Sequence, residues 1–251
     1  MIYRSLRNIY KAIRRKYNNY KLKTKFNLVV FNHIPKCGGT SIQNFMNQFY
    51  VIKRCKIALH AIELDAPLDK KLFDIELKLD IKNLIGKQNL FICGHFPNFI
   101  SFFYDIYPEI DFNNGNVLKI TILRDPYEAA ISRYYHIQRI NQYNTTSDLQ
   151  SYLETESNYF SVFLECTEQN YKQILDSYHL IGLAENMDKT ISMLNGLLGT
   201  NSNFTPHSNK RPNQKKIVLS EDVYLKFRSN NQLDYLIYSY AQYKFHRLTQ
   251  K

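Results

Sequence analysis

The sequence predicts an α/β fold in which a central parallel β-sheet is covered by helices on both faces. Short apolar runs of strand length alternate with longer helical patterns along most of the chain, which is typical of a sheet of parallel strands. One glycine-rich stretch and one Arg-Asp-Pro stretch each follow such an apolar run. Ligands of this fold class bind beyond the carboxyl ends of the strands, so these two stretches mark the candidate site.

Composition indicates one globular domain, because 251 residues with 44% hydrophobic residues are enough to bury a full core. The four cysteines form no C-x-x-C pair and have no histidine at metal-ligand spacing. We therefore expect reduced thiols and no metal site. No run approaches the ~18 apolar residues of a membrane span, and the basic N-terminus lacks the apolar core of a signal peptide. These features predict a cytoplasmic protein.

Charge is distributed unevenly along the chain. Residues 1–62 contain 13 of the 33 Lys and Arg residues and none of the 22 acidic residues. This bias predicts an anionic partner near the N-terminus: a nucleotide, a membrane surface, an acidic glycan or a nucleic acid. Residues 1–25 also show apolar positions at helical spacing, so they predict a basic amphipathic helix. Two interpretations of this helix stay open, packing on its own domain (26–251) or lying on an anionic membrane.

Four strands and a series of helices are predicted from hydrophobic periodicity. The strands are expected at 27–31, 90–93, 117–123 and 179–183. The helices are expected at 40–50, 126–141, 186–198 and 219–247, the last with a break near residues 230–231. Residues 199–216 have the composition of a loop, which carries the basic residues Lys210, Arg211, Lys215 and Lys216.

The stretch "HIPKCGGTSI" (33–42) connects the first predicted strand to the first helix. Gly38 and Gly39 allow a tight turn whose backbone N–H groups point at an anion, and Thr40 and Ser41 add hydroxyl groups at the positive end of the helix dipole. In an ATP-binding P-loop the lysine follows the glycines, whereas Lys36 precedes them. The pattern therefore predicts an anion site of another kind.

The stretch "LRDPYEAAISRYYH" (123–136) follows another predicted strand and continues into a helix, with Pro126 in the first turn. Arg124 lies at the end of the strand, and Ser132 lies about two helical turns further on. A guanidinium and a hydroxyl at this spacing predict a second anion site. A local salt bridge between Arg124 and Asp125 is the simpler interpretation of the same residues.

These two stretches resemble the motifs of the PAPS-dependent sulfotransferases, in particular the branch with the heparan sulfate 2-O- and 6-O-sulfotransferases and their bacterial relatives. The resemblance begins at Phe26 and implies a P-loop-like three-layer sandwich, with a central parallel sheet flanked by helices. It also implies transfer of a sulfuryl group from 3′-phosphoadenylyl sulfate (PAPS) to a carbohydrate hydroxyl, with PAP as product and no metal.

The resemblance also assigns roles to residues. The first stretch would hold the 5′-phosphosulfate, and Arg124 and Ser132 would hold the 3′-phosphate. The loop residues concerned are Lys36, Cys37, Gly38, Gly39, Thr40 and Ser41. Lys36 would stabilise the charge that develops on the oxygen between phosphorus and sulfur. Two residues depart from the family pattern, Cys37 in place of Thr and Ala129 in place of Arg.

His95, directly after the strand "LFIC" (90–93), is our candidate for the general base, as it resembles the catalytic histidine of the 2-O- and 6-O-enzymes. His33, beside Lys36, is the second candidate. Lys210 and Arg211 are expected to close over the nucleotide or an anionic acceptor, although a solvated basic loop is an equal alternative.

Two other classes of function remain at this stage, a P-loop nucleotide phosphotransferase and a non-enzymatic protein that binds polyanions or a membrane surface. The phosphotransferase would need a Gly-Lys-Ser/Thr sequence and an acidic Mg²⁺ site, which we do not find. The partner expected from the resemblance is a surface glycan or its precursor in bacterial polysaccharide biosynthesis, not a nucleic acid. Such an enzyme would be cytoplasmic, or peripheral at the inner face of the membrane.

Overall fold

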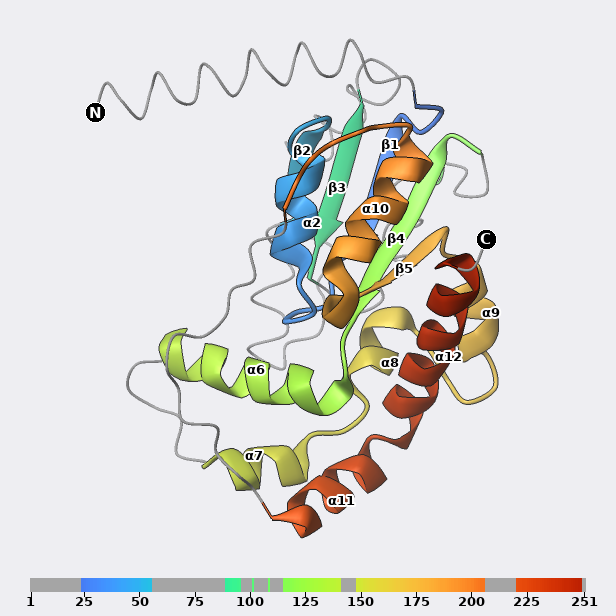
Figure 1. Cartoon of the computed structure of the whole chain (residues 1–251). Helices are drawn as coiled ribbons and strands as arrows, with labels where there is room; N and C mark the ends of the chain where they lie inside the picture. Colours follow the sequence, from blue (N-terminus) through green and yellow to red (C-terminus); the bar gives the residue numbers. More distant parts are fainter. Residues whose placement is uncertain are drawn as a thin grey trace, which may run out of the picture.

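The computed structural model describes residues 24–55, 89–95, 101, 108, 115–140, 148–205 and 220–249. At its centre is a five-stranded sheet in the order β2-β3-β1-β4-β5, in which every pair of neighbouring strands is parallel (Figure 1). The predicted α/β fold with a central parallel sheet is therefore confirmed. The strands are β1 (Leu28–Asn32), β2 (Val51–Cys55), β3 (Leu90–Gly94), β4 (Val117–Leu123) and β5 (Leu180–Leu183).

Four of the five strands lie where the apolar runs predict them, within one residue at each end. Every residue of β1, β3, β4 and β5 is buried, which is why these strands have largely apolar sequences. The polar exceptions are Asn32, Lys119 and Thr121. The edge strand β2 was not predicted. Lys53 and Arg54 interrupt its apolar run, so its five residues give no clear strand signal.

Helices cover both faces of the sheet. Asn32 donates a hydrogen bond from Nδ2 to the backbone carbonyl oxygen of Phe163 in α8, at 2.7 Å, and is in register with Thr121 of β4. Because side chains alternate along a strand, Ile122 points to the opposite face, where it lies beside Thr190 of α10. Helices α8 and α10 therefore pack on opposite faces. Figure 1 shows α2 over the same face as α10, which completes the predicted three-layer arrangement.

The helical predictions are confirmed with small shifts at the ends. The first helix ends at Met46 rather than residue 50, because the next N–H groups, those of Gln48 and Phe49, bond three residues back in turns and not four residues back. The break predicted near residue 230 separates α11 from α12. Short helices α7, α8 and α9 were not predicted, since six or seven residues give little periodicity. The helices are α2 (Gly39–Met46), α6 (Pro126–Ile140), α7 (Leu149–Thr155), α8 (Tyr159–Leu164), α9 (Tyr171–Asp176), α10 (Met187–Leu198), α11 (Glu221–Asn230) and α12 (Gln232–Thr249).

A second, smaller core lies beyond the carboxyl end of β4, where α6, α7 and α11 pack together (Figure 1). Its buried residues are Ala130, Leu149, Leu153, Val223 and Phe227. This arrangement places α6, the helix that carries Ser132, between the strand ends and the helices α7 and α11.

Two of the predicted features lie outside the described residues. They are the amphipathic helix of residues 1–25, of which only 24 and 25 are described, and the basic loop with Lys210 and Arg211. Residues 200–205 have no regular secondary structure, as predicted. In the part of the chain that the structure describes, we find no helix whose length and hydropathy would let it cross a bilayer.

Candidate functional site

The two motifs lie at the carboxyl ends of neighbouring strands. From β1 the chain continues to β2 on one side of the sheet, and from β4 it continues to β5 on the other. The connections therefore diverge between β1 and β4, which is where a parallel sheet leaves a crevice for a ligand. Because Asn32 is in register with Gly94 and with Thr121, the residues after β1, β3 and β4 emerge side by side.

The loop after β1 presents backbone donors that no described residue uses. Lys36 has a φ of 68° and Gly38 a φ of 88°, so the backbone turns sharply before α2 begins at Gly39. None of the described residues accepts a hydrogen bond from the N–H groups of Gly38, Gly39 or Thr40. Three successive amides at the positive end of a helix form a binding site for an anion.

Both glycines of the loop are required by their neighbours. A Cβ atom at Gly39 would overlap the imidazole ring of His33, and one at Gly38 would lie 2.7 Å from Cε of Met187. Gly38 also has the left-handed conformation that side chains disfavour. The loop therefore keeps its backbone against His33 on one side and the start of α10 on the other.

Cys37 points into the core and not toward the crevice. Its exposed fraction is 0%, and burial raises the pKa of its thiol to about 12, against the opposing effect of the guanidinium groups of Arg124 and Arg133. A neutral, enclosed thiol leaves only the backbone of this residue for a ligand. The exchange of Thr for Cys at this position therefore removes no side chain from the crevice.

His33 and His95 form a pair at the ends of β1 and β3. Their ring centroids are 3.8 Å apart, and Nδ1 of His95 lies 2.6 Å from the backbone carbonyl oxygen of His33. A carbonyl oxygen only accepts hydrogen bonds, so Nδ1 of a neutral His95 carries the proton and Nε2 is its basic nitrogen. Gln43 of α2 lies against the pair, with its Nε2 3.1 Å from Nδ1 of His33.

Arg124 and Ser132 belong to the end of β4 and to α6. Nη2 of Arg124 lies 3.2 Å from Oε2 of Glu128, and both side chains are partly exposed. The N–H of Glu128 in turn donates to Asp125, which caps the helix. Arg124 and the loop of residues 33–41 follow neighbouring parallel strands, so the two motifs lie at the same edge of the sheet. Ser132 is half-buried two turns along α6.

Glu185 follows β5 and supports the second motif. Its Oε1 accepts a hydrogen bond from the backbone N–H of Asp125 at 2.8 Å, which fixes the turn that carries Arg124. The structure thus places the sequence-predicted residues of 33–41, His95, Arg124 and the start of α6 at the same edge of the sheet, where His33 and His95 are in direct contact. Lys210 and Arg211 lie outside the described residues. Among the residues that are described, no group of three or more His, Cys, Asp or Glu side chains could hold a metal ion.

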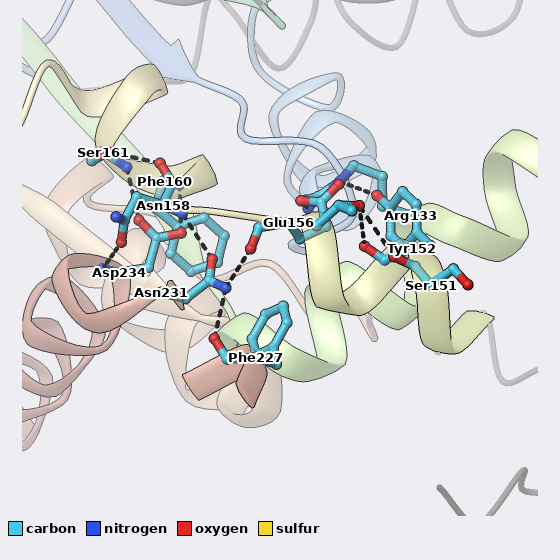
Figure 2. A network of polar contacts seen from close by, with 11 residues as sticks. Arg133, Ser151, Tyr152, Glu156, Asn158, Phe160, Ser161, Phe227, Asn231 and Asp234 are labelled. Atoms are coloured by element: carbon cyan, nitrogen blue, oxygen red, sulfur yellow. Dashed lines mark hydrogen bonds and ion pairs between the residues drawn. The ribbon is translucent and has the colours of Figure 1, made fainter. Parts of the chain in front are cut away.

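A polar network that the sequence did not suggest surrounds Arg133 (Figure 2). Arg133, the residue after Ser132, forms an ion pair with Glu156 and donates a hydrogen bond from Nε to Oη of Tyr152 at 2.8 Å. The two partners are 19 and 23 residues away along the chain. No local sequence pattern relates residues at such separations, so the sequence contains no signal that these side chains would interact.

Comparison with known proteins identifies the group to which these features belong. A family model described as "Sulfotransferase family" matches residues 20–241. The solved structure of a sulfotransferase from Alicyclobacillus acidocaldarius is similar, with a TM-score of 0.53 at 14% identity, covering 87% of this chain and 95% of that one. A mouse sulfotransferase in complex with PAP matches with a TM-score of 0.45 at 14% identity, over 86% of this chain and 69% of that one.

A retinol dehydratase in complex with retinol and PAP is a more distant match, with a TM-score of 0.38 at 14% identity, over 74% of this chain and 63% of that one. A search of curated protein sequences found no significant match. The family model covers most of the chain, and the similarity to the Alicyclobacillus acidocaldarius structure supports the fold.

Proposed function

Because the chain belongs to the sulfotransferase family, we propose that it transfers a sulfuryl group from PAPS to a hydroxyl group of a carbohydrate. One observation carries the proposal: two candidate anion-binding elements, the loop after β1 and the Arg124 motif after β4, lie at the carboxyl ends of neighbouring parallel strands. A donor with a phosphosulfate at one position of its ribose and a phosphate at another needs two such elements at once.

The residues present fit this donor. The three amides of Gly38, Gly39 and Thr40 match the oxygens of a 5′-phosphosulfate, and the guanidinium of Arg124 with the hydroxyl of Ser132 matches a 3′-phosphate. When bound, PAPS supplies an activated sulfuryl group whose leaving group is a phosphate. An ATP site would lack a use for the second element.

Each residue then has one task in the reaction. Lys36 would supply positive charge to the leaving phosphate of the bound donor, which would favour the transition state over the ground state. His95 accepts the proton of the attacking hydroxyl at Nε2, while its Nδ1–H remains bonded to the carbonyl of His33. His33 is the second candidate for this role.

The acceptor is proposed from the resemblance of the two motifs to carbohydrate sulfotransferases. We propose a surface glycan or its precursor in bacterial polysaccharide biosynthesis as the substrate. The enzyme would then work in the cytoplasm, with residues 1–25 either packed on the domain or resting on the inner face of the membrane. Sulfated glycans from cells with and without the gene, compared by mass spectrometry, test the acceptor.

Calorimetric titration with PAP, AMP and ATP tests the donor site. We expect PAP to bind on the order of tenfold more tightly than AMP or ATP, because only PAP carries a 3′-phosphate that can accept charged hydrogen bonds from the second element. Equal affinity for the three nucleotides would overturn the proposal. Transfer of labelled sulfate from PAPS should also continue in EDTA, since lysine and backbone dipoles supply the positive charge. A requirement for Mg²⁺ would favour a phosphotransferase instead.

A further inference from the structure

Arg133 is almost completely enclosed, although it follows directly on Ser132 in the amphipathic helix α6. Its exposed fraction is 8%. Its guanidinium lies 3.5 Å from the ring centroid of Tyr159. It also donates to Tyr152 and forms an ion pair with Glu156 (Figure 2). Burial alone would lower its pKa, but Glu156 and the two tyrosines raise it above its ordinary value, so the side chain stays cationic.

Glu156 is itself held by residues near the C-terminal helices. It lies in the segment between α7 and α8, whose backbone is anchored by Asn231 at the junction of α11 and α12 (Figure 2). Nδ2 of Asn231 donates to the carbonyl oxygen of Glu156 at 2.9 Å, and its Oδ1 accepts from the N–H of Asn158 at 2.8 Å. The backbone of Glu156 is therefore anchored at this junction, and α6 is attached to Glu156 through Arg133.

The start of α8 is fixed to the same junction by a second acid. The carboxylate of Asp234 in α12 accepts hydrogen bonds from the N–H groups of Phe160 and Ser161, at 2.8 and 3.0 Å. Tyr159, on whose ring Arg133 rests, precedes these two residues. The two groups that contact the guanidinium, Glu156 and Tyr159, therefore lie in a segment whose backbone is held by Asn231 and Asp234.

Arg133 also borders the core on which the loop of residues 33–41, called the phosphate loop below, is packed. Cys37 of this loop is wholly buried in the main hydrophobic core, and Tyr159, on whose ring the guanidinium rests, packs against the same core. Arg133 thus connects α6, which carries Ser132, to the core beneath the phosphate loop.

Stability alone is a poor reason for such an arginine. Burying an ion pair carries a desolvation penalty that the attraction between the two charges often does no more than offset. A protein with an apolar pair of similar volume in its place is frequently as stable. No described residue accepts a hydrogen bond from the buried Nη1 group of Arg133, which adds a further cost. An arginine that is buried at this cost, directly beside Ser132, indicates a role in the proposed donor site.

We propose that Arg133 is a positioning residue: clamped by Glu156, Tyr152 and Tyr159, it sets where α6 presents Ser132 relative to the phosphate loop. The proposal rests on the donor site proposed above. It predicts that replacing Arg133 lowers the affinity for ligands that use both anion-binding elements and leaves the affinity for ligands that use only the loop unchanged. A general loss of fold stability would lower both affinities alike.

The test compares PAP, which carries both phosphates, with AMP, which carries only the 5′-phosphate, by calorimetric titration of the full chain. Arg133→Met should weaken PAP binding on the order of tenfold and AMP binding less than about twofold, so that the PAP preference is lost. Arg133→Lys, which keeps the ion pair but not the planar fork, should lie between wild type and Arg133→Met. Arg139→Met, an exposed arginine in the last turn of the same helix, is the matched control and should leave both affinities unchanged.

Tyr152→Phe removes a single hydroxyl group and keeps the test decisive if Arg133→Met does not fold. It should reduce the PAP preference in the same direction by a smaller factor. Equal weakening of PAP and AMP in either variant, or a full PAP preference in both, would overturn the positioning role. If wild type itself fails to prefer PAP over AMP, the proposed donor site is wrong and this inference falls with it.

Discussion

Nδ1 of His95 donates a hydrogen bond to the backbone carbonyl oxygen of His33 at 2.6 Å, so the residue after β3 is oriented by the residue after β1. The bond fixes which ring nitrogen of His95 is protonated and therefore which one can accept a proton. It also joins the candidate general base to the phosphate loop, whose position depends on the same His33.

His95→Ala should lower kcat by about 10²–10⁴, the usual contribution of a general base, while the affinity for PAP stays nearly unchanged. The wild-type rate should rise with pH through the range in which histidines lose their proton, and the variant should lose this rise. Steady-state kinetics at several pH values, with calorimetric titration of PAP, provide the measurement. Near-normal turnover of His95→Ala together with an inactive His33→Ala would move the base into the loop.

Arg124→Ala should weaken PAP binding by about 1.5–3 kcal/mol, the scale of a hydrogen bond to a charged group. Glu128→Gln is the informative partner variant, since the Glu128 carboxylate lies 3.2 Å from the guanidinium and competes with a phosphate for it. We expect this variant to bind PAP more tightly by about 0.3–1 kcal/mol, in keeping with a partly exposed ion pair. Unchanged PAP binding in Arg124→Ala would contradict the 3′-phosphate site.

Gly39→Ala should disable the loop, because the added methyl group would overlap the ring of His33 and force that ring away from His95. Turnover and PAP affinity should both fall. Gly196→Ala provides the control: nothing lies within 4 Å of its added carbon atom in α10, so the change should stabilise the helix by about 0.5–1 kcal/mol and leave activity intact. Normal activity of Gly39→Ala would show that the His33 contact is dispensable.

Asp234 should make stability depend on pH. Burial raises the pKa of its carboxyl from 3.8 to about 7, against the effect of the N–H groups of Phe160 and Ser161, so the folded state retains a proton that the unfolded state loses. Its contribution to stability is thus complete below pH 3.8 and declines as pH rises toward 7, by at most about 1.4 kcal/mol per pH unit.

Urea denaturation of wild type and Asp234→Asn measures this contribution, with the pH varied between 4.5 and 8 in steps of about one pH unit. The free energy of unfolding of wild type should fall with pH relative to that of the variant, and the difference should level off above about pH 7. Parallel curves for the two proteins would mean that Asp234 is already ionised in the folded state at low pH.

The sequence by itself determined the strands β1, β3, β4 and β5, since each is a buried apolar run bounded by polar residues. It also determined that the loop of Gly38 and Gly39 and the stretch from Arg124 follow such strands. Parallel strands end at one edge, so local patterns were enough to place the two anion-binding elements near each other.

Only the tertiary structure decided which side chains meet. His33 and His95 are 62 residues apart, and Arg133 and Glu156 are 23 apart. Their contacts depend on strand register and on how α7 and α8 pack against α12, which no short stretch of sequence encodes. The direction of Cys37 was likewise open, because a turn with φ values of 68° at Lys36 and 88° at Gly38 can send the side chain between them to the ligand or to the core. Packing against the core settled it, since an apolar thiol gains more from burial than from facing an anion.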